Sequence, residues 1–236
     1  MLTFTFGNAK IPGWIAIFSL PAGHTCPGAD KCLSRANRVT GKLTDGSQTE
    51  FRCYAASQEA NYPQVRESRW NNFTALRGKT KQEMIKVIEQ SLPKAPIVRI
   101  HASGDFFSQS YFDAWLYVAK KNPNQIFYGY TKSLQFFAAR KNQLPKNFRF
   151  VASRGGKFDS LIDSLRLRFA EVIYTIGAAK RKKLKIDKDD SSVYKSKENI
   201  GLLIHGNQPA KSKASIAWQK IKTTIGGYNR SRKENI

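Results

Sequence analysis

Short apolar runs alternate with amphipathic runs along most of the chain. Six apolar runs are bounded by Gly, Pro or polar residues, as buried strands are: 13–20, 97–105, 125–131, 148–153, 170–177 and 199–206. Apolar residues recur at helical spacing in 80–92, 108–121, 133–141, 157–168 and from Ser215 onward. This alternation predicts repeated β/α units and a mostly parallel sheet, either open or curled into a barrel.

The helix predicted over 80–92 has its own start and stop signals. Thr80 and Glu83 have the spacing of a capping box, in which each side chain bonds to the other's main chain. Pro93 follows directly and ends the run, because proline cannot donate the next helical hydrogen bond. Similar signals, without internal repeats or a low-complexity linker, predict one α/β domain over 1–236. It includes a cysteine loop (21–57) and a basic C-terminal tail (226–236).

Composition changes this picture little, except for charge. Hydrophobic residues make up 41% of the 236 positions and aromatic residues 12%, which is ordinary for a globular protein. No run of 18 apolar residues occurs, and Met1 is not followed by a basic region and an apolar signal core. We therefore expect a protein of the cytoplasm, with no membrane partner.

The chain carries a large excess of positive charge. Forty Lys and Arg against seventeen Asp and Glu give a formal net charge of +23, which favours polyanions through counterion release. We expect a nucleic-acid partner, DNA or RNA, although basic runs are also common on solvated surfaces. The expected contacts lie in the basic run 178–188 and in the stretch 61–72, where cationic and aromatic residues interleave: Lys180, Arg181, Lys182, Lys183, Arg66, Arg69 and Trp70. A structural amphipathic helix with Trp70 in the core explains the second stretch equally well.

Polar residues stand where several predicted strands end. In parallel β/α folds these carboxyl ends carry the active site, and core packing does not explain polar residues at several of them. We expect Asp105 and His101 to be catalytic, with Arg99, His101 and Ser103 on one face of their strand. A turn or helix-cap role for Asp105 is the alternative. The residues expected at a cofactor are Ser103, Gly104, Asp105, Thr131, Lys132, Ser153 and His205.

All three cysteines lie between the first strand and the helical region that follows it. Cys26, Cys32 and Cys53 have the spacing C-x5-C-x20-C within a loop rich in Gly, Pro and charge. An odd number of thiols in a reducing compartment argues against a disulfide framework, and the loop is a poor place for core residues. Three thiolates suit a [4Fe–4S] cluster with one open iron, or a zinc ion with a histidine such as His24 as fourth ligand. Plain packing of small apolar side chains is the remaining alternative.

Several motifs of well-known enzyme classes are absent. We find no Gly-rich phosphate loop ending in Lys-Ser/Thr, no G-x-S-x-G elbow and no H-E-x-x-H. Hydrolysis of nucleotides by a P-loop, serine hydrolase chemistry and zincin proteolysis therefore drop out of the leading hypotheses.

Five stretches together resemble a known family. The strings "FSLPAGHTCPGADKC", "FRCYAASQEANYPQVRESRWNN", "RIHASGDFFSQSYFDAWLYVAKKNP", "FYGYTKSL" and "GLLIHGNQP" resemble the gene product 88 family of bacteriophages and mobile elements, over about residues 11–220. This resemblance implies membership of the family and, if a phage encodes the protein, the host cell's cytoplasm as its location. It implies no settled activity.

A broader resemblance is to the radical S-adenosylmethionine enzymes, which implies a partial (β/α)6 TIM-like barrel. In those enzymes three cysteines after the first strand hold a [4Fe–4S] cluster, and a Gly-Gly-Glu-like turn after the second contacts the amine of S-adenosylmethionine. The resemblance implies that Cys26, Cys32 and Cys53 are cluster ligands and that Gly104 and Asp105 form the amine-binding turn. The usual spacing there is C-x3-C-x2-C, and Asp replaces Glu here.

Three functions follow as hypotheses. The first is an iron–sulfur enzyme acting on a nucleic acid or nucleotide, with radical S-adenosylmethionine chemistry as its possible form. The second is a zinc-containing barrel like the tRNA-guanine transglycosylases, in which Asp105 would attack C1′ while a base is exchanged. The third is a basic nucleic-acid binder with a metal-stapled loop and no catalysis. Oligomeric state stays open.

Overall fold

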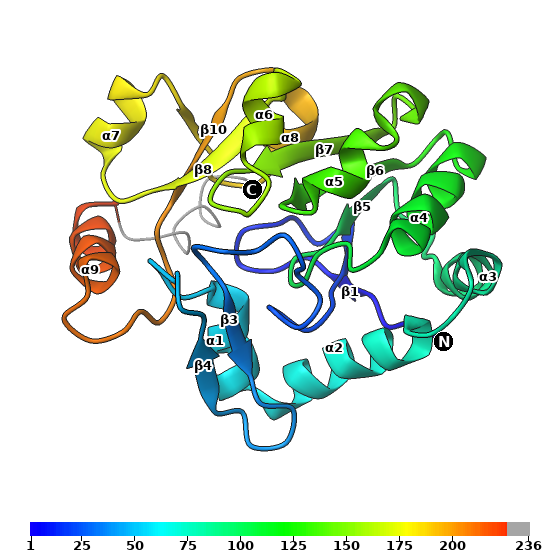
Figure 1. Cartoon of the computed structure of the whole chain (residues 1–236), viewed down its shortest axis with the longest axis horizontal. Helices are drawn as coiled ribbons and strands as arrows, with labels where there is room; N and C mark the ends of the chain where they lie inside the picture. Colours follow the sequence, from blue (N-terminus) through cyan, green and yellow to red (C-terminus); the bar gives the residue numbers. More distant parts are fainter. Residues whose placement is uncertain (226–236) are drawn as a thin grey trace.

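The computed structural model describes residues 1–225, and the expected basic tail 226–236 lies outside them. Its centre is a sheet in the order β1-β2-β5-β6-β7-β8-β10-β9 (Figure 1). The strands of this sheet are β1 (Thr5–Phe6), β2 (Ile15–Phe18), β5 (Ile97–Ile100), β6 (Ile126–Thr131), β7 (Phe148–Ser153), β8 (Phe169–Ile173), β9 (Lys185–Ile186) and β10 (Ile200–Leu203). Each of the six predicted apolar runs contains, wholly or in large part, one of these strands.

Every neighbouring pair in this sheet is parallel except β1 with β2. The strands from β2 to β8 lie side by side in chain order, as right-handed β/α crossovers produce them. Among the described residues, β1 and β9 each have one neighbour only, so the sheet is not closed. The prediction of an α/β fold with a mostly parallel sheet is confirmed.

The helices follow the predicted alternation. They are α1 (Tyr54–Asn61), α2 (Pro63–Leu76), α3 (Lys81–Ser91), α4 (Gln109–Lys121), α5 (Leu134–Ala138), α6 (Ser160–Ser164), α7 (Ile176–Arg181), α8 (Ser191–Lys195) and α9 (Lys213–Ile225), with a 3₁₀ turn at Lys141–Gln143. The capping box of Thr80 and Glu83 is present at the start of α3. No helix in residues 1–225 is both long and apolar enough to cross a bilayer.

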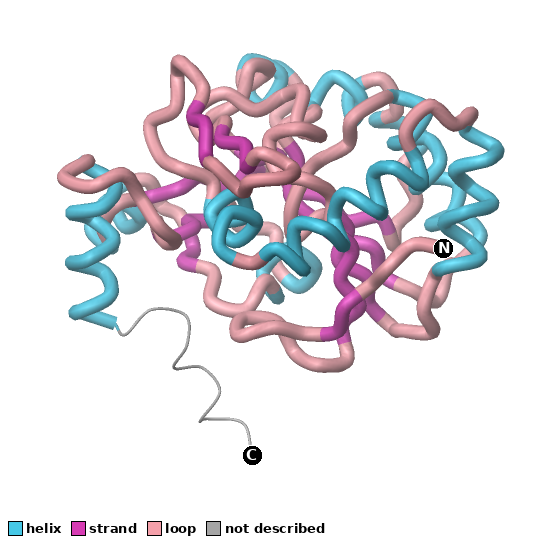
Figure 2. Tube along the Cα trace, turned by 90° about the horizontal axis from the view of Figure 1, so that it is seen from below, coloured by secondary structure: helices cyan, strands magenta, loops and turns pink. Residues whose placement is uncertain are grey.

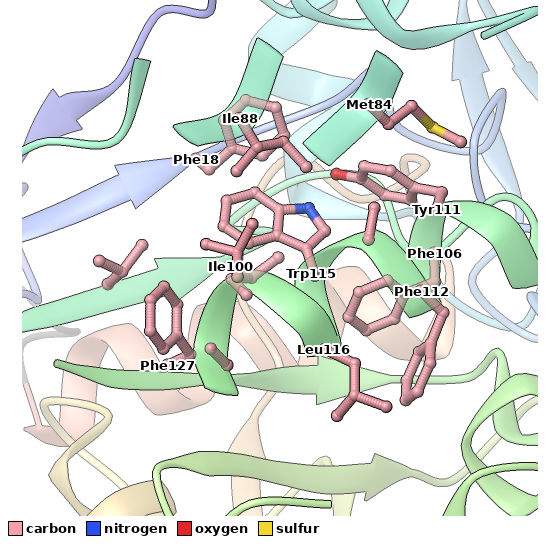
Figure 3. Packing of buried hydrophobic residues seen from close by; sticks show 14 of the residues in the cluster. Phe18, Met84, Ile88, Ile100, Phe106, Tyr111, Phe112, Trp115, Leu116 and Phe127 are labelled. Atoms are coloured by element: carbon pink, nitrogen blue, oxygen red, sulfur yellow. The ribbon is translucent and has the colours of Figure 1, made fainter. Parts of the chain in front are cut away.

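The main hydrophobic core lies between the sheet and helices α3 and α4. Trp115 of α4 is fully buried among Phe18 of β2, Ile100 of β5 and Ile88 of α3 (Figure 3). Phe18 and Trp115 have ring centroids 5.5 Å apart. This packing fixes β2 and β5 side by side, so that their carboxyl ends open at the same edge of the sheet.

The opposite face of the sheet is covered in part by α8, which contacts β6 and β7. Val193 and Tyr194 of α8 pack there with Ile17 and Tyr128. A second core cluster joins α9 to β8 and β10. In the view turned by 90°, the strands run through the middle of the molecule and α9 stands at the end away from the N-terminus (Figure 2).

The cysteine loop contains structure that the apolar pattern did not predict. A small hairpin of β3 (Ser34–Ala36) and β4 (Leu43–Asp45) lies between Cys32 and Cys53, and α1 starts directly after Cys53. These elements are short and polar, so their sequences show little periodicity. The hairpin shortens the distance that the twenty intervening residues must span.

Replacing Trp115 with Ala should lower the free energy of unfolding by about 3–5 kcal/mol, because the deletion leaves a cavity in a fully packed core. Tyr117 on the same helix is 43% exposed, so Tyr117→Ala is the matched control and should change stability little. Urea denaturation of both variants tests this. Equal losses would place the main core elsewhere.

Candidate metal centre

The three cysteines come together at the carboxyl ends of β2 and β5. Burial raises the pKa of the Cys26 thiol well above its usual value, and Asp105, Cys53 and Cys32 raise it further. Burial also raises the pKa of Cys53 to about 11, with Cys32 adding to the rise. Because such interactions weaken with distance, the three sulfurs lie near one another.

The three thiols are half-buried. All three are free thiols and each keeps part of its surface in contact with solvent, although burial dominates the pKa of Cys26 and Cys53. We call the neighbourhood of these three sulfurs the thiol site. Two main-chain features favour thiolate there: Gly23 N–H donates to Cys26 Sγ at 3.3 Å, and Cys53 is the N-cap residue of α1.

The arrangement of the three thiols does not by itself identify a metal. No group of three or more His, Cys, Asp or Glu side chains in residues 1–225 is arranged to hold one metal ion.

A buried carboxylate that sequence reasoning missed joins the chain segments around the thiol site. Glu59 of α1 is fully buried, and its Oε1 accepts from Ala22 N–H (2.8 Å), Arg69 Nη1 (2.9 Å) and Ser103 Oγ (3.1 Å). Its Oε2 has no hydrogen-bond partner. Ala22 precedes Cys26, Glu59 follows Cys53, and Ser103 follows β5, so one carboxylate ties three segments of the site.

Asp105 also serves as a structural joint. Its Oδ1 accepts from Phe106 N–H (2.8 Å) and Thr131 Oγ1 (2.7 Å), and its Oδ2 accepts from Lys132 N–H (2.7 Å) and Ser133 N–H (3.2 Å). Burial raises its pKa, and the bonds from Thr131, Lys132 and Phe106 oppose that rise. A carboxylate has about four acceptor positions, and all are occupied. The structure therefore favours the turn role over the predicted catalytic role.

The His101 ring packs among Phe18, Phe106 and Tyr111 of the main core. The backbone φ of His101 is 69°, which breaks the strand alternation after Ile100 and turns the ring toward Phe106 and Tyr111. Its Nε2 is 3.0 Å from Tyr111 Oη, and burial lowers its pKa to about 3. Arg99 instead pairs with Asp190 at 2.6 Å on the α8 side. The prediction that Arg99, His101 and Ser103 share one face is wrong, and a catalytic role for His101 loses its basis.

The turn after β5 is closed by neighbouring chain. Gly104 has φ of 80°, and a Cβ there would come within 2.6 Å of Thr25 Oγ1 and Leu20 Cβ. Ser103 O accepts from Leu20 N–H at 2.8 Å. The predicted cofactor contacts of Ser103, Gly104 and Asp105 are thus taken up by contacts inside the protein.

The other four predicted cofactor residues, Thr131, Lys132, Ser153 and His205, lie at or just after the carboxyl ends of strands. Tyr54, next to Cys53, donates from Oη to Ala102 O and packs edge-on against His205, with ring centroids 4.8 Å apart. Burial lowers the pKa of His205 to about 4, and the charge of Lys10 adds to this, so the ring is neutral near pH 7. Lys132 and Ser153 stand at the ends of β6 and β7 and are joined by a hydrogen bond of 2.5 Å. Thr131 is buried and donates to Asp105.

The residues predicted to contact nucleic acid fall into two groups. Arg66 and Arg69 are buried: Arg66 donates to main-chain carbonyls of Arg38, Glu59 and Val39, and Arg69 pairs with Glu59. Their guanidinium groups are committed inside the protein, so we withdraw both from the predicted interface. Trp70 is partly buried against His24, with ring centroids 4.9 Å apart and Arg38 over its ring.

The second group is on the surface. Lys180, Arg181, Lys182 and Lys183 are all exposed at and just after the end of α7, and Lys182 pairs with Glu171. A surface cation in an isolated pair contributes little to stability, so this run is free to serve another purpose.

The fold defines a class: an α/β protein with a mostly parallel sheet, whose three cysteines lie in the segment between β2 and α1. A family model described as Gene product 88 matches residues 2–220, and the chain belongs to this family. The Gene 88 protein of Mycobacterium phage L5 is 31% identical over 129 residues, which are 53% of this chain and 51% of that protein. The match thus spans about half the length of the curated relative. No solved structure matches the chain.

Replacing Asp105 with Asn should lower the free energy of unfolding by about 1–3 kcal/mol, because the amide NH2 would face donors and leave at least one buried N–H without an acceptor. Asp163→Asn removes a carboxylate whose side chain is 70% exposed and should leave the urea midpoint unchanged. If Asp105→Asn were as stable as the parent protein, the carboxylate would not be a joint, and its predicted catalytic role would return.

Proposed function

We propose that Cys26, Cys32 and Cys53 hold a [4Fe–4S] cluster and that the protein is an iron–sulfur enzyme acting on a nucleic acid or nucleotide. The observation that supports this most is that the three thiols lie near one another beyond the carboxyl end of β2, where Cys32 and Cys53 raise the pKa of Cys26 and Cys32 raises that of Cys53. The carboxyl edge of a parallel sheet is where enzymes of this architecture bind their ligands.

The surroundings of the thiols fit a cationic group. Without a cation, burial and mutual proximity keep Cys26 and Cys53 protonated. Iron ions would remove that penalty by binding the thiolate forms, with release of protons. The Gly23 N–H at Cys26 and the start of α1 at Cys53 would support the bound thiolates. Three thiolate ligands leave one iron open to an outside ligand, and clusters of this kind supply electrons for radical chemistry.

The chain's own residues would do the rest. Glu59 positions the segments of Cys26 and Cys53, and the ring of Tyr54, next to Cys53, packs against His205. S-adenosylmethionine stays a proposed cofactor, but its amine would need partners other than Asp105, whose acceptor positions are occupied. The zinc transglycosylase alternative loses support for the same reason, since it needs Asp105 as nucleophile.

Anaerobically purified protein should contain about four irons with sulfide and show a broad band near ~400 nm. Cys26→Ala, Cys32→Ala and Cys53→Ala should each remove most of the iron, because each thiolate binds a different iron atom. Ser57→Ala, a change of similar size in α1, is the control and should keep it. Full iron retention in any one cysteine variant would take that residue out of the ligand set, and one zinc with no iron would contradict the proposal.

We further propose that the exposed cations at and just after the end of α7 contact the backbone of a nucleic acid. Lys180→Gln with Arg181→Gln should weaken binding to duplex DNA or RNA and reduce the salt dependence of log K by about 1.8 for duplex DNA, since two phosphate contacts are lost. The control is Lys81→Gln with Lys86→Gln on α3, at the other end of the molecule (Figure 1). Fluorescence anisotropy at several salt concentrations measures both. If log K depended on salt equally in the two double variants, the cations of α7 would contribute only diffuse electrostatic attraction, and the proposed contact would be wrong.

A further inference from the structure

Lys132 is the one buried lysine among residues 1–225, with 8% of its surface exposed. It follows directly after β6, at the edge of the sheet that carries the thiols. Burying an ammonium group is costly unless an anion compensates its charge, so lysines rarely lie in this position without a carboxylate. The partners of Nζ therefore decide what the residue does.

Both hydrogen-bond partners of Nζ are neutral. It donates to Ser153 Oγ at 2.5 Å and to Arg154 O at 3.1 Å. It forms no ion pair: no carboxylate oxygen of the described residues lies within 4.0 Å. The Arg154 side chain is engaged with Asp163 at 2.8 Å.

Asp105 offsets the positive charge of the Lys132 ammonium group only through space, without a hydrogen bond to Nζ. Its carboxylate accepts from the main-chain N–H of Lys132, and its four acceptor positions are filled by other donors. An ammonium group has three donors, and two of those of Lys132 are used. Because Ser153 Oγ accepts from Nζ, its own O–H is available to donate outward.

Three loops hold this arrangement in place. A Cβ on Gly28, two residues after Cys26, would come within 2.0 Å of Lys132 O. A Cβ on Gly156 would come within 2.7 Å of Gly28 O and 3.2 Å of Lys132 Cβ. The cysteine loop, the β6 end and the β7 end therefore close on Lys132, and its donors are fixed before any ligand arrives.

We propose that Lys132 and Ser153 form an oxyanion-binding subsite at the carboxyl ends of β6 and β7, which takes a carboxylate or phosphate of a ligand. The subsite deepens the proposed function by stating the charge of the ligand, but it rests on the contacts of Lys132 alone. It holds whether or not the thiols bind iron. A phosphate would come from a nucleotide, and a carboxylate from an amino-acid-type cofactor.

Isothermal titration of the full chain with inorganic phosphate, a nucleoside monophosphate and S-adenosylmethionine tests the subsite. Lys132→Met should weaken binding of at least one probe by roughly 10- to 100-fold, since a hydrogen bond from a charged group is lost. Ser153→Ala should weaken the same probe to a smaller extent. Lys157→Met, an exposed lysine of the same β7 loop, should bind as the parent does. The probe that responds identifies phosphate or carboxylate as the ligand's anion.

Stability in the absence of ligand separates binding from a structural role. Removing an uncompensated buried charge should leave the thermal midpoint of Lys132→Met equal to or above that of the parent protein. A lower midpoint with unchanged affinity for all probes would make Lys132 a structural residue and overturn the subsite. Iron content of the same variant keeps the two proposals apart. Lys132-dependent binding in a chain that takes up no iron would support the subsite and contradict the cluster.

Discussion

The position of the thiols depends on the buried ion pair of Glu59 and Arg69. Arg69 Nη1 is 2.9 Å from Glu59 Oε1 and also donates to Ala55 O at 2.9 Å, two residues after Cys53. The same carboxylate oxygen accepts from Ala22 N–H, four residues before Cys26. Breaking a buried pair of this kind costs about 3–5 kcal/mol, because one charge is left without its partner. That cost keeps two loops far apart in sequence in one arrangement.

The edge of the sheet is organised by charges whose roles differ. Asp105 is saturated by donors and joins the turn after β5 to the end of β6. Lys132 Nζ is bonded only to neutral oxygens, and Glu59 keeps one buried oxygen without a partner. Saturated groups hold the framework, whereas incompletely satisfied ones are where an incoming ligand gains most. Asp105 is thus a structural group, whereas Lys132 and Glu59 keep hydrogen-bonding capacity for a ligand.

Much of the fold follows from local patterns, and much of the site does not. Apolar runs predict six strands of the sheet, and the capping box at Thr80 predicts where α3 begins, because both depend on neighbouring residues. His101 was misplaced because a single positive φ reverses which side its ring faces. Arg66 and Arg69 have the interleaved pattern of a nucleic-acid contact, but carbonyls and a carboxylate from distant segments bind them. Glu59 gave no signal, since its three donors lie 10, 37 and 44 residues away.

The central claim is that the three thiols form one cradle for an iron–sulfur cluster. Anomalous diffraction from crystals grown without oxygen, recorded on both sides of the iron and zinc absorption edges, locates each metal relative to the sulfurs. The account predicts a strong iron peak at the thiol site, within bonding distance of the sulfurs of Cys26, Cys32 and Cys53, and no zinc peak there. A single zinc peak, or iron bonded to fewer than these three sulfurs, would contradict it.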